Sequence, residues 1–174
     1  SPFASIQAAI DISSADHVVF VSAGTYYEHL VINSKNISII GVDRETTIIH
    51  GNDNGIVVSF SDADTSFFHG FTITNGFGSG NDFGGGISIV TGSAPTINDL
   101  IIENNEGNHG GGIGVGSGSL LISNCIIRGN SAHTGGGLYS NSDSGIELNY
   151  VLIYDNYASA NGGGITLANS SGII

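Results

Sequence analysis

The stretch IENNEGNHGGGI, residues 102–113, contains two marks that recur along the chain. The first is an Ile followed three residues later by an Asn, and the second is a triplet of glycines followed by an aliphatic residue. The triplets recur at intervals of 26, 25 and 27 residues. Two marks that keep phase with each other indicate a structural repeat. The triplets are Gly84–Gly86, Gly110–Gly112, Gly135–Gly137 and Gly162–Gly164, and the Ile–Asn pairs are Ile102–Asn105, Ile127–Asn130 and Ile153–Asn156.

Alignment of the copies on these marks produces alternating apolar and polar columns. Such alternation in every copy is what a stacked parallel sheet requires, because each residue then lies about 4.8 Å above its counterpart. The repeat lacks the Leu frame of a leucine-rich horseshoe and is shorter than a propeller blade. The sequence therefore predicts an all-β fold, a right-handed parallel β-helix of about 25 residues per coil. Two of the apolar columns are Phe68, Ile97, Ile122, Leu148 and Phe71, Leu100, Cys125, Val151.

Asn105, Asn130 and Asn156 occupy the same place in successive coils. Stacked Asn side chains bond one another along the axis, and Asn tolerates the left-handed backbone of a turn, so we expect a structural Asn ladder. The glycine triplets fit tight turns in which φ is positive and no Cβ is tolerated. Cys125 is the only cysteine, and we expect it to be a buried thiol.

The two ends of the predicted solenoid differ. Residues 2–14 have apolar side chains at helical spacing, with Pro2 suited to a first helical turn. We expect a short helix that closes the first coil, and we divide the single domain, residues 1–174, into a cap at 1–16 and coils at 17–174. At the other end no cap follows, and an exposed sheet edge promotes association. We therefore expect the natural chain to continue beyond Ile174, and self-assembly through the uncapped edge is a further hypothesis.

The chain is strongly acidic, with 15 Asp and Glu, 3 Lys and Arg, and a formal net charge of −12. Nucleic acids and anionic membranes bind clustered cations, so we exclude both as partners, and no apolar run is long enough to span a membrane. Ca²⁺ suits carboxylates and turn carbonyls. We expect Asp62 and Asp64 to lie on one side of an extended segment as a calcium site, with solvated turn residues as the alternative.

The block from Ser5 to about Gly51 resembles the opening of proteins of the pectin-lyase-like superfamily. It contains VVFVSAGTYYE and ISIIG, which are similar to the V-x-V-x-x-G-x-Y-x-E and I-x-I-x-G of that superfamily. The later repeats are similar to the F-x-x-N and GGA-I repeats of polymorphic bacterial outer-membrane adhesins, with Ile for Phe and Gly for Ala. These resemblances imply a parallel β-helix. They leave the activity open, because this superfold hosts lyases, hydrolases, esterases, adhesins and phage spikes.

The chain contains only parts of the motifs that mark the superfamily's enzymes. GTYYE, residues 24–28, is similar to a motif of pectin methylesterases, but the chain has no Trp, and Asp82-Phe83-Gly84 continues with glycines. Phe68-His69-Gly70 is the nearest match to the Gly-His-Gly of polygalacturonases, and we expect His69 to be an ordinary exposed strand residue. The cations Lys35, Arg44 and Arg128 do not share a repeat phase, which argues against a lyase that neutralises a uronate. Arg128 lies in the column between Glu103 and Tyr154, where we expect a surface ion pair with Glu103.

Three tyrosines crowd one coil at outward phases, Tyr150, Tyr154 and Tyr157. Aromatic faces stack on sugar rings, so we interpret them as a glycan platform, with shielding of the strand surface as the alternative. The sequence thus predicts a secreted or cell-surface module for binding, adhesion or scaffolding, whose partner is a polysaccharide or a cell-surface glycan. The alternative is part of a carbohydrate-active enzyme, a polysaccharide lyase or glycosidase, and the sequence assigns no catalytic residue.

Overall fold

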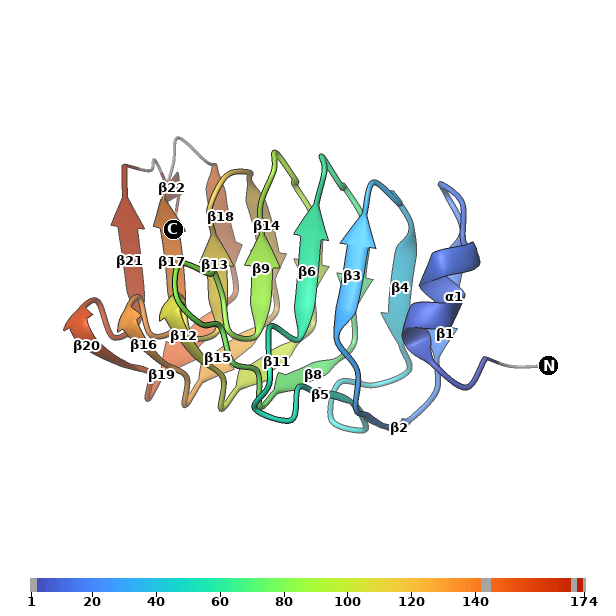
Figure 1. The fold of residues 1–174 in the computed structure, drawn as a ribbon, viewed down its shortest axis with the longest axis horizontal. Helices are drawn as coiled ribbons and strands as arrows, with labels where there is room; N and C mark the ends of the chain where they lie inside the picture. Colours follow the sequence, from blue (N-terminus) through green and yellow to red (C-terminus); the bar gives the residue numbers. More distant parts are fainter. Residues whose placement is uncertain (1–2, 142–144, 170–171, 174) are drawn as a thin grey trace.

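The computed structural model describes residues 3–141, 145–169 and 172–173, which fold into a solenoid of parallel strands (Figure 1). The strands form three long sheets and one short sheet that follow the length of the molecule, with the helix α1 at one end. Each strand pairs with its counterpart in the next coil. The predicted all-β parallel β-helix with a short capping helix is therefore confirmed.

Strand bounds are as follows. Sheet A contains β1 (Val18–Val21), β4 (Ser38–Gly41), β7 (Phe67–His69), β10 (Thr96–Asn98), β14 (Leu120–Ser123), β18 (Ile146–Asn149) and β22 (Gly172–Ile173). Sheet B contains β2 (Gly24–Tyr26), β5 (Thr47–His50), β8 (Thr72–Thr74), β11 (Ile101–Glu103), β15 (Ile126–Arg128) and β19 (Leu152–Tyr154). Sheet C contains β3 (Leu30–Asn33), β6 (Val58–Ser61), β9 (Ile87–Ile89), β13 (Ile113–Val115), β17 (Leu138–Asn141) and β21 (Ile165–Ala168). Sheet D, which lies between sheets B and C in each later coil, contains β12 (Glu106–His109), β16 (Ser131–Thr134) and β20 (Tyr157–Asn161).

The register confirms the predicted columns and refines the length of the coil. Phe68, Ile97, Ile122 and Leu148 are aligned across sheet A. Bonded partners on adjacent coils are 25 residues apart at Asn98 and Ser123, but 29 apart at His69 and Asn98. The predicted repeat of about 25 residues therefore holds for the later coils, whereas the coil between His69 and Asn98 is longer. Part of the difference lies in the longer connection between β8 and β9.

The Asn ladder runs along the buried turn that precedes sheet D. Asn105 Nδ2 donates to Asn130 Oδ1 at 3.0 Å, and Asn130 Nδ2 donates to Asn156 Oδ1 at 3.0 Å. Asn105 and Asn130 are each 1% exposed, so the predicted ladder is confirmed. The left-handed residues are the ones just before the ladder, Asn104, Gly129 and Asp155.

The glycine triplets form the turns from sheet D into sheet C. Their first residues have positive φ, as at Gly110 with 82°. The second residue has no space for a side chain, because a Cβ on Gly111 would meet the carbonyl oxygens of Ser131 and Gly136 in the next coil. Close backbone approach therefore requires glycine here, as predicted.

Cys125 is 1% exposed, as predicted, and its thiol lies between neighbouring coils. Leu100 N donates to Cys125 Sγ at 3.2 Å. Desolvation by burial raises the pKa of Cys125 from 9.0 to about 12, so the thiol stays protonated and unreactive at neutral pH.

The helix α1 (Ile6–Ile12) covers the first coil with its buried Ile6 and Ile10. It is shorter than predicted, because Ser5 is its N-cap and its side chain accepts a hydrogen bond from Ala8 N. The carboxylate of Glu28 accepts hydrogen bonds from the backbone N–H groups of Ile6 and Gln7, both at 2.9 Å. The Glu of GTYYE therefore stabilises the cap, since free N–H groups at a helix start favour an anion. Among the residues that the structure describes, no helix combines the length and the apolarity needed to cross a membrane.

Candidate functional site

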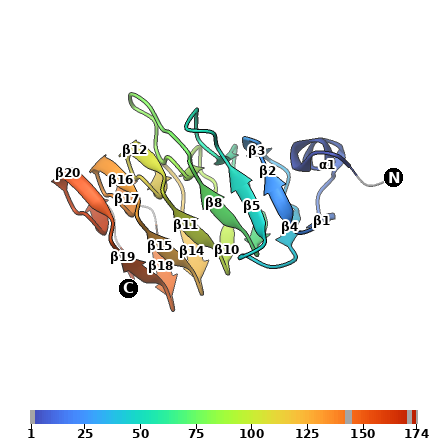
Figure 2. The ribbon, with the colours of Figure 1, turned by 90° about the horizontal axis from the view of Figure 1, so that it is seen from below.

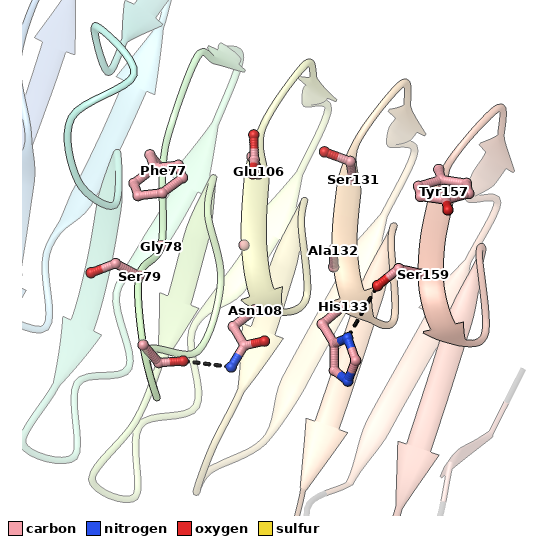
Figure 3. A pocket seen from close by; sticks show the side chains of 12 residues that line it. Phe77, Gly78, Ser79, Glu106, Asn108, Ser131, Ala132, His133, Tyr157 and Ser159 are labelled. Carbon is pink, nitrogen blue, oxygen red and sulfur yellow. Dashed lines mark hydrogen bonds between the residues drawn. The ribbon is translucent and has the colours of Figure 1, made fainter.

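A groove of about 720 Å³ crosses sheet D from coil to coil. Its side chains form two rows, and each row takes one residue from each successive coil (Figure 3). Figure 2 shows β12, β16 and β20 side by side along this face. The upper row is Phe77, Glu106, Ser131 and Tyr157, and the lower row is Ser79, Asn108, His133 and Ser159.

Successive side chains of a strand point to opposite faces of the sheet, and this alternation gives the groove its two rows and the small residues between them. Glu106 pairs in register with Ser131, and Ser131 pairs with Tyr157, so these three side chains emerge from one line of the sheet. The residues between the two rows are small: Gly107 pairs with Ala132, and both are buried. The register shifts after Ala132, and His133 Nδ1 lies 3.0 Å from Ser159 Oγ beside this irregularity. A bulge of this kind re-aims the side chains next to it.

One wall of the groove is the segment Phe77–Gly80, which belongs to the long connection between β8 and β9. Phe77 forms a parallel bridge with Glu106, and Gly78 N donates to Glu106 O at 2.8 Å. Asn108 Nδ2 donates to Gly80 O at 2.5 Å. These bonds fix Phe77 at the end of the upper row, where the residue is 39% exposed.

The same connection is anchored at its far end by aromatic packing. The ring of Phe83 lies 6.0 Å from Tyr139 and 5.7 Å from His109, centroid to centroid. Gly84 N donates to His109 O at 2.8 Å. The Nδ1 atom of His109 is buried and has no hydrogen-bond partner among the described residues. Phe83, from the segment compared with an esterase motif, therefore holds the wall in place.

The groove contains an exposed carboxylate, Glu106, and no Lys or Arg. Glu106 projects between the aromatic side chains that end the upper row (Figure 3). Together with hydroxyl, amide and imidazole groups in both rows, this surface offers hydrogen-bond partners between two aromatic faces. Such a combination suits a polar ligand that has apolar ring faces.

The three predicted tyrosines occupy different parts of the last described coil. Tyr157 lines the groove and is 65% exposed. Tyr154 ends β19 in sheet B, and its hydroxyl accepts a hydrogen bond from Arg128 Nη1 at 2.9 Å. Tyr150 lies at the corner between β18 and β19 and is 91% exposed. The structure therefore places one of the three, Tyr157, in a hollow of the surface.

Arg128 joins Tyr154 to Glu103 along one column of sheet B. Its Nη2 lies 2.7 Å from Glu103 Oε2, which confirms the ion pair expected from the register. The hydrogen bond to Tyr154 and the pairing with Glu103 both raise the pKa of Arg128 above its ordinary value. Tyr154 thus takes part in a surface network of sheet B.

The two aspartates proposed for calcium have different surroundings. Asp64 is 0% exposed, and its carboxylate accepts hydrogen bonds from the backbone N–H groups of Lys35, Asn36 and Ser66. Asp62 is exposed, and the chain turns at Asp62 and Ala63, whose φ angles are 56° and 58°. The segment is therefore not extended, and the expectation of two carboxylates on one side is wrong. No group of three or more His, Cys, Asp or Glu is arranged to hold a metal within the described ranges, and calcium binding stays a prediction.

A second hollow, of about 620 Å³, lies on the outer face of sheet A. His69 is half-buried rather than exposed: its Nδ1 lies 2.9 Å from Asn98 Oδ1, and its ring stacks on Phe67. Asn98 Nδ2 in turn donates to Ser123 Oγ at 2.6 Å. Apolar side chains make up most of the remaining lining, which includes Phe20, Val21, Ala23, Ile40 and Val42. This hollow offers fewer groups than the groove on sheet D to orient a polar ligand.

No family model and no curated protein sequence matches the chain. Among solved structures, it is similar to the pectin methylesterase PemA from Erwinia chrysanthemi, with a TM-score of 0.64 and 16% sequence identity. The likeness covers 90% of this chain and 52% of the esterase, so the chain spans about half the length of that enzyme. The chain therefore has the pectin-lyase-like parallel β-helix fold. The similarity of its repeats to those of adhesins stays a prediction.

Proposed function

We propose that the chain is a carbohydrate-binding β-helix module that holds an extended polysaccharide along the groove of sheet D. One observation carries this proposal: the exposed rings of Phe77 and Tyr157 end a row whose middle positions are the polar Glu106 and Ser131. Because the row crosses three strand spacings, the backbone positions that carry the two rings are about 14 Å apart along the solenoid axis. That separation suits a chain of several sugars lying along the solenoid axis.

The recognition chemistry follows from the two kinds of side chain. Each aromatic ring offers a flat apolar face to the C–H face of a sugar ring. Between the rings, Ser131, Asn108 and Ser159 offer hydrogen-bond partners to sugar hydroxyl groups. The backbone bonds that fix Phe77 and the strand that fixes Tyr157 reduce the entropy lost on binding, because the two rings are already separated as the ligand requires.

A secreted or cell-surface location belongs to the same proposal, since structural polysaccharides and cell-surface glycans lie there. Adhesion and scaffolding are the biological roles that a binding module of this shape would serve. Self-association through the last coil stays a prediction, and sedimentation at several protein concentrations would measure it.

The direct test is calorimetric titration of the protein with a panel of soluble oligosaccharides. We expect Tyr157→Ala and Phe77→Ala each to weaken binding by about threefold to tenfold, the effect of losing one aromatic contact. Tyr150→Ala is the matched control, because Tyr150 is 91% exposed and lies outside the groove. Circular dichroism must show that all variants stay folded. Equal weakening by the three variants, or no saturable binding to any member of the panel, would overturn the proposal.

Catalysis on a polysaccharide is the second candidate, and it is favoured by the likeness of the fold to a pectin methylesterase. Incubation with methylated pectin, followed by assays for methanol, for new reducing ends and for unsaturated ends, separates the two functions. A binding module releases none of these products. Turnover that is abolished by a substitution in the chain would replace the binding proposal with an enzymatic one.

A further inference from the structure

The groove on sheet D contains a carboxylate whose charge no cation of the described chain neutralises. Glu106 is exposed on β12, and only its backbone is engaged: Glu106 N donates to Gly76 O, and Glu106 O accepts from Gly78 N. The other titratable side chains that line the groove are the imidazole of His133, in the lower row, and the phenol of Tyr157, in the upper row. A ligand held between Phe77 and Tyr157 would therefore lie against negative charge.

The few cations of the chain are held elsewhere. Lys35 Nζ donates to the carbonyl oxygens of Asp11 and Ser13, at 2.8 and 3.2 Å. Arg44 Nη1 lies 3.1 Å from Asp99 Oδ1, and Arg128 lies against Glu103. These three are all the Lys and Arg residues of the sequence. A glycan with carboxylate groups thus finds no Lys or Arg in the groove and meets a chain with a formal net charge of −12 at pH 7.

From this charge distribution we propose that the groove selects glycans with free amino groups, such as oligomers of glucosamine, over neutral glycans and polyuronates. The inference rests on the proposed function, because the rings of Phe77 and Tyr157 would position the sugars. A sugar held between the rings brings its ammonium group toward Glu106, and an N⁺–H···O⁻ hydrogen bond is stronger than a neutral one. The formal net charge of −12 also raises the concentration of a cationic ligand near the protein.

The experiment compares oligomers of glucosamine and of N-acetylglucosamine with equal length and linkage, so that the acyl groups and the charge they remove are the only difference. Titration is carried out in mildly acidic buffer, with an oligomer of galacturonate as the anionic ligand. We expect the amino oligomer to bind most tightly. The difference in affinity between the amino oligomer and the other two oligomers should decrease when the ionic strength rises from about 0.01 to about 0.15 M, because the Debye length falls from about 30 to about 8 Å.

Glu106→Gln should weaken binding of the amino oligomer by about twofold to fivefold, the range of an exposed ion pair, and should weaken binding of the acetylated oligomer less, because a neutral ligand has no ion pair to lose. Glu147→Gln is the matched control: it removes the same charge from β18 of sheet A, outside the groove. An oligolysine of the same charge serves as a second control. It should bind without dependence on Tyr157, whereas the amino oligomer should lose affinity in Tyr157→Ala.

The outcomes separate the inference from the function on which it rests. Equal or tighter binding of the acetylated or galacturonate oligomer overturns the inference and leaves the carbohydrate-binding module intact. An equal effect of the two Glu→Gln variants shows general attraction rather than selection in the groove, which also overturns the inference. Binding to none of the oligosaccharides defeats both proposals.

Discussion

The Asn ladder is the feature whose energy can be worked out most directly, through the substitution Asn130→Ala. Asn130 is the middle member of the ladder and is 1% exposed. Its Oδ1 accepts from the N and the Nδ2 of Asn105, both at 3.0 Å. Its Nδ2 donates to Ile102 O at 2.9 Å and to Asn156 Oδ1 at 3.0 Å. Alanine removes all four hydrogen bonds and leaves Asn105 N and Ile102 O buried without these partners.

A net value of about 1 kcal/mol for each hydrogen bond predicts a loss of about 4 kcal/mol. That loss is a large share of the 5–15 kcal/mol typical of a folded domain. The assay is urea unfolding followed by far-UV circular dichroism, with the free energy extrapolated to water and the slope m compared between variants.

Asn149→Ala is the control, because Asn149 is exposed on sheet A and its side chain donates to Glu147 Oε1. We expect it to change stability by less than about 0.5 kcal/mol. If Asn130→Ala costs no more than Asn149→Ala at unchanged m, the ladder does not stabilise the solenoid and the hydrogen-bond argument is refuted.

Three further predictions concern the backbone and the core. Gly111→Ala places a Cβ against two backbone carbonyls, so we expect a loss of about 3 kcal/mol or more in urea unfolding. Gly145→Ala, whose nearest neighbour would be Ser119 Oγ at 3.9 Å, should leave the midpoint unchanged. Tyr150→Asn should raise the free energy of unfolding by about 1 kcal/mol, because Tyr150 has a φ of 55° and Asn tolerates this left-handed backbone better. The same corner of earlier coils has Gly70, Asp99 and Asn124, also with positive φ. An equal gain in Tyr150→Ala would contradict this reason. Above pH 9 the unfolded thiol of Cys125 loses its proton while the buried thiol, with its pKa raised to about 12, keeps it. Stability should therefore fall by about 1.4 kcal/mol per pH unit between about pH 9 and 12, and Cys125→Val should lack this component, so equal slopes would disprove it.

The inward residues could be predicted from the sequence because a solenoid repeats its own packing. Each inward side chain lies on the equivalent residue of the next coil, so the same residue type recurs at the same phase. Ile73, Ile102 and Ile127 are all 0% exposed. The register that follows from them also placed Arg128 beside Glu103, and the structure confirms this ion pair. The periodicity of the sequence therefore predicted the fold and one ion pair on the surface.

The groove could not be predicted in the same way, because part of it breaks the repeat. Phe77 lies in the long connection between β8 and β9, and a backbone bridge brings it beside Glu106. No spacing in the sequence indicates that bridge. Asp62 and Asp64 show the same limit: the predicted geometry needed an extended backbone, and the left-handed φ of Asp62 and Ala63 sends the two carboxylates to different surroundings.

Along β12 and β16, buried residues that the fold requires to be small alternate with more exposed residues that line the groove. Gly107 and Ala132 are buried, and a Cβ on Gly107 would meet Gly110 O at 2.6 Å. These positions must stay small so that sheet D packs onto the glycine turns. Glu106 and His133 are exposed and meet no such demand. Because alternate side chains point to opposite faces, the groove can change its ligand through its outward rows while the inward positions keep the coil intact. The variants that test binding can therefore be confined to the outward rows, where a loss of affinity does not imply a loss of structure.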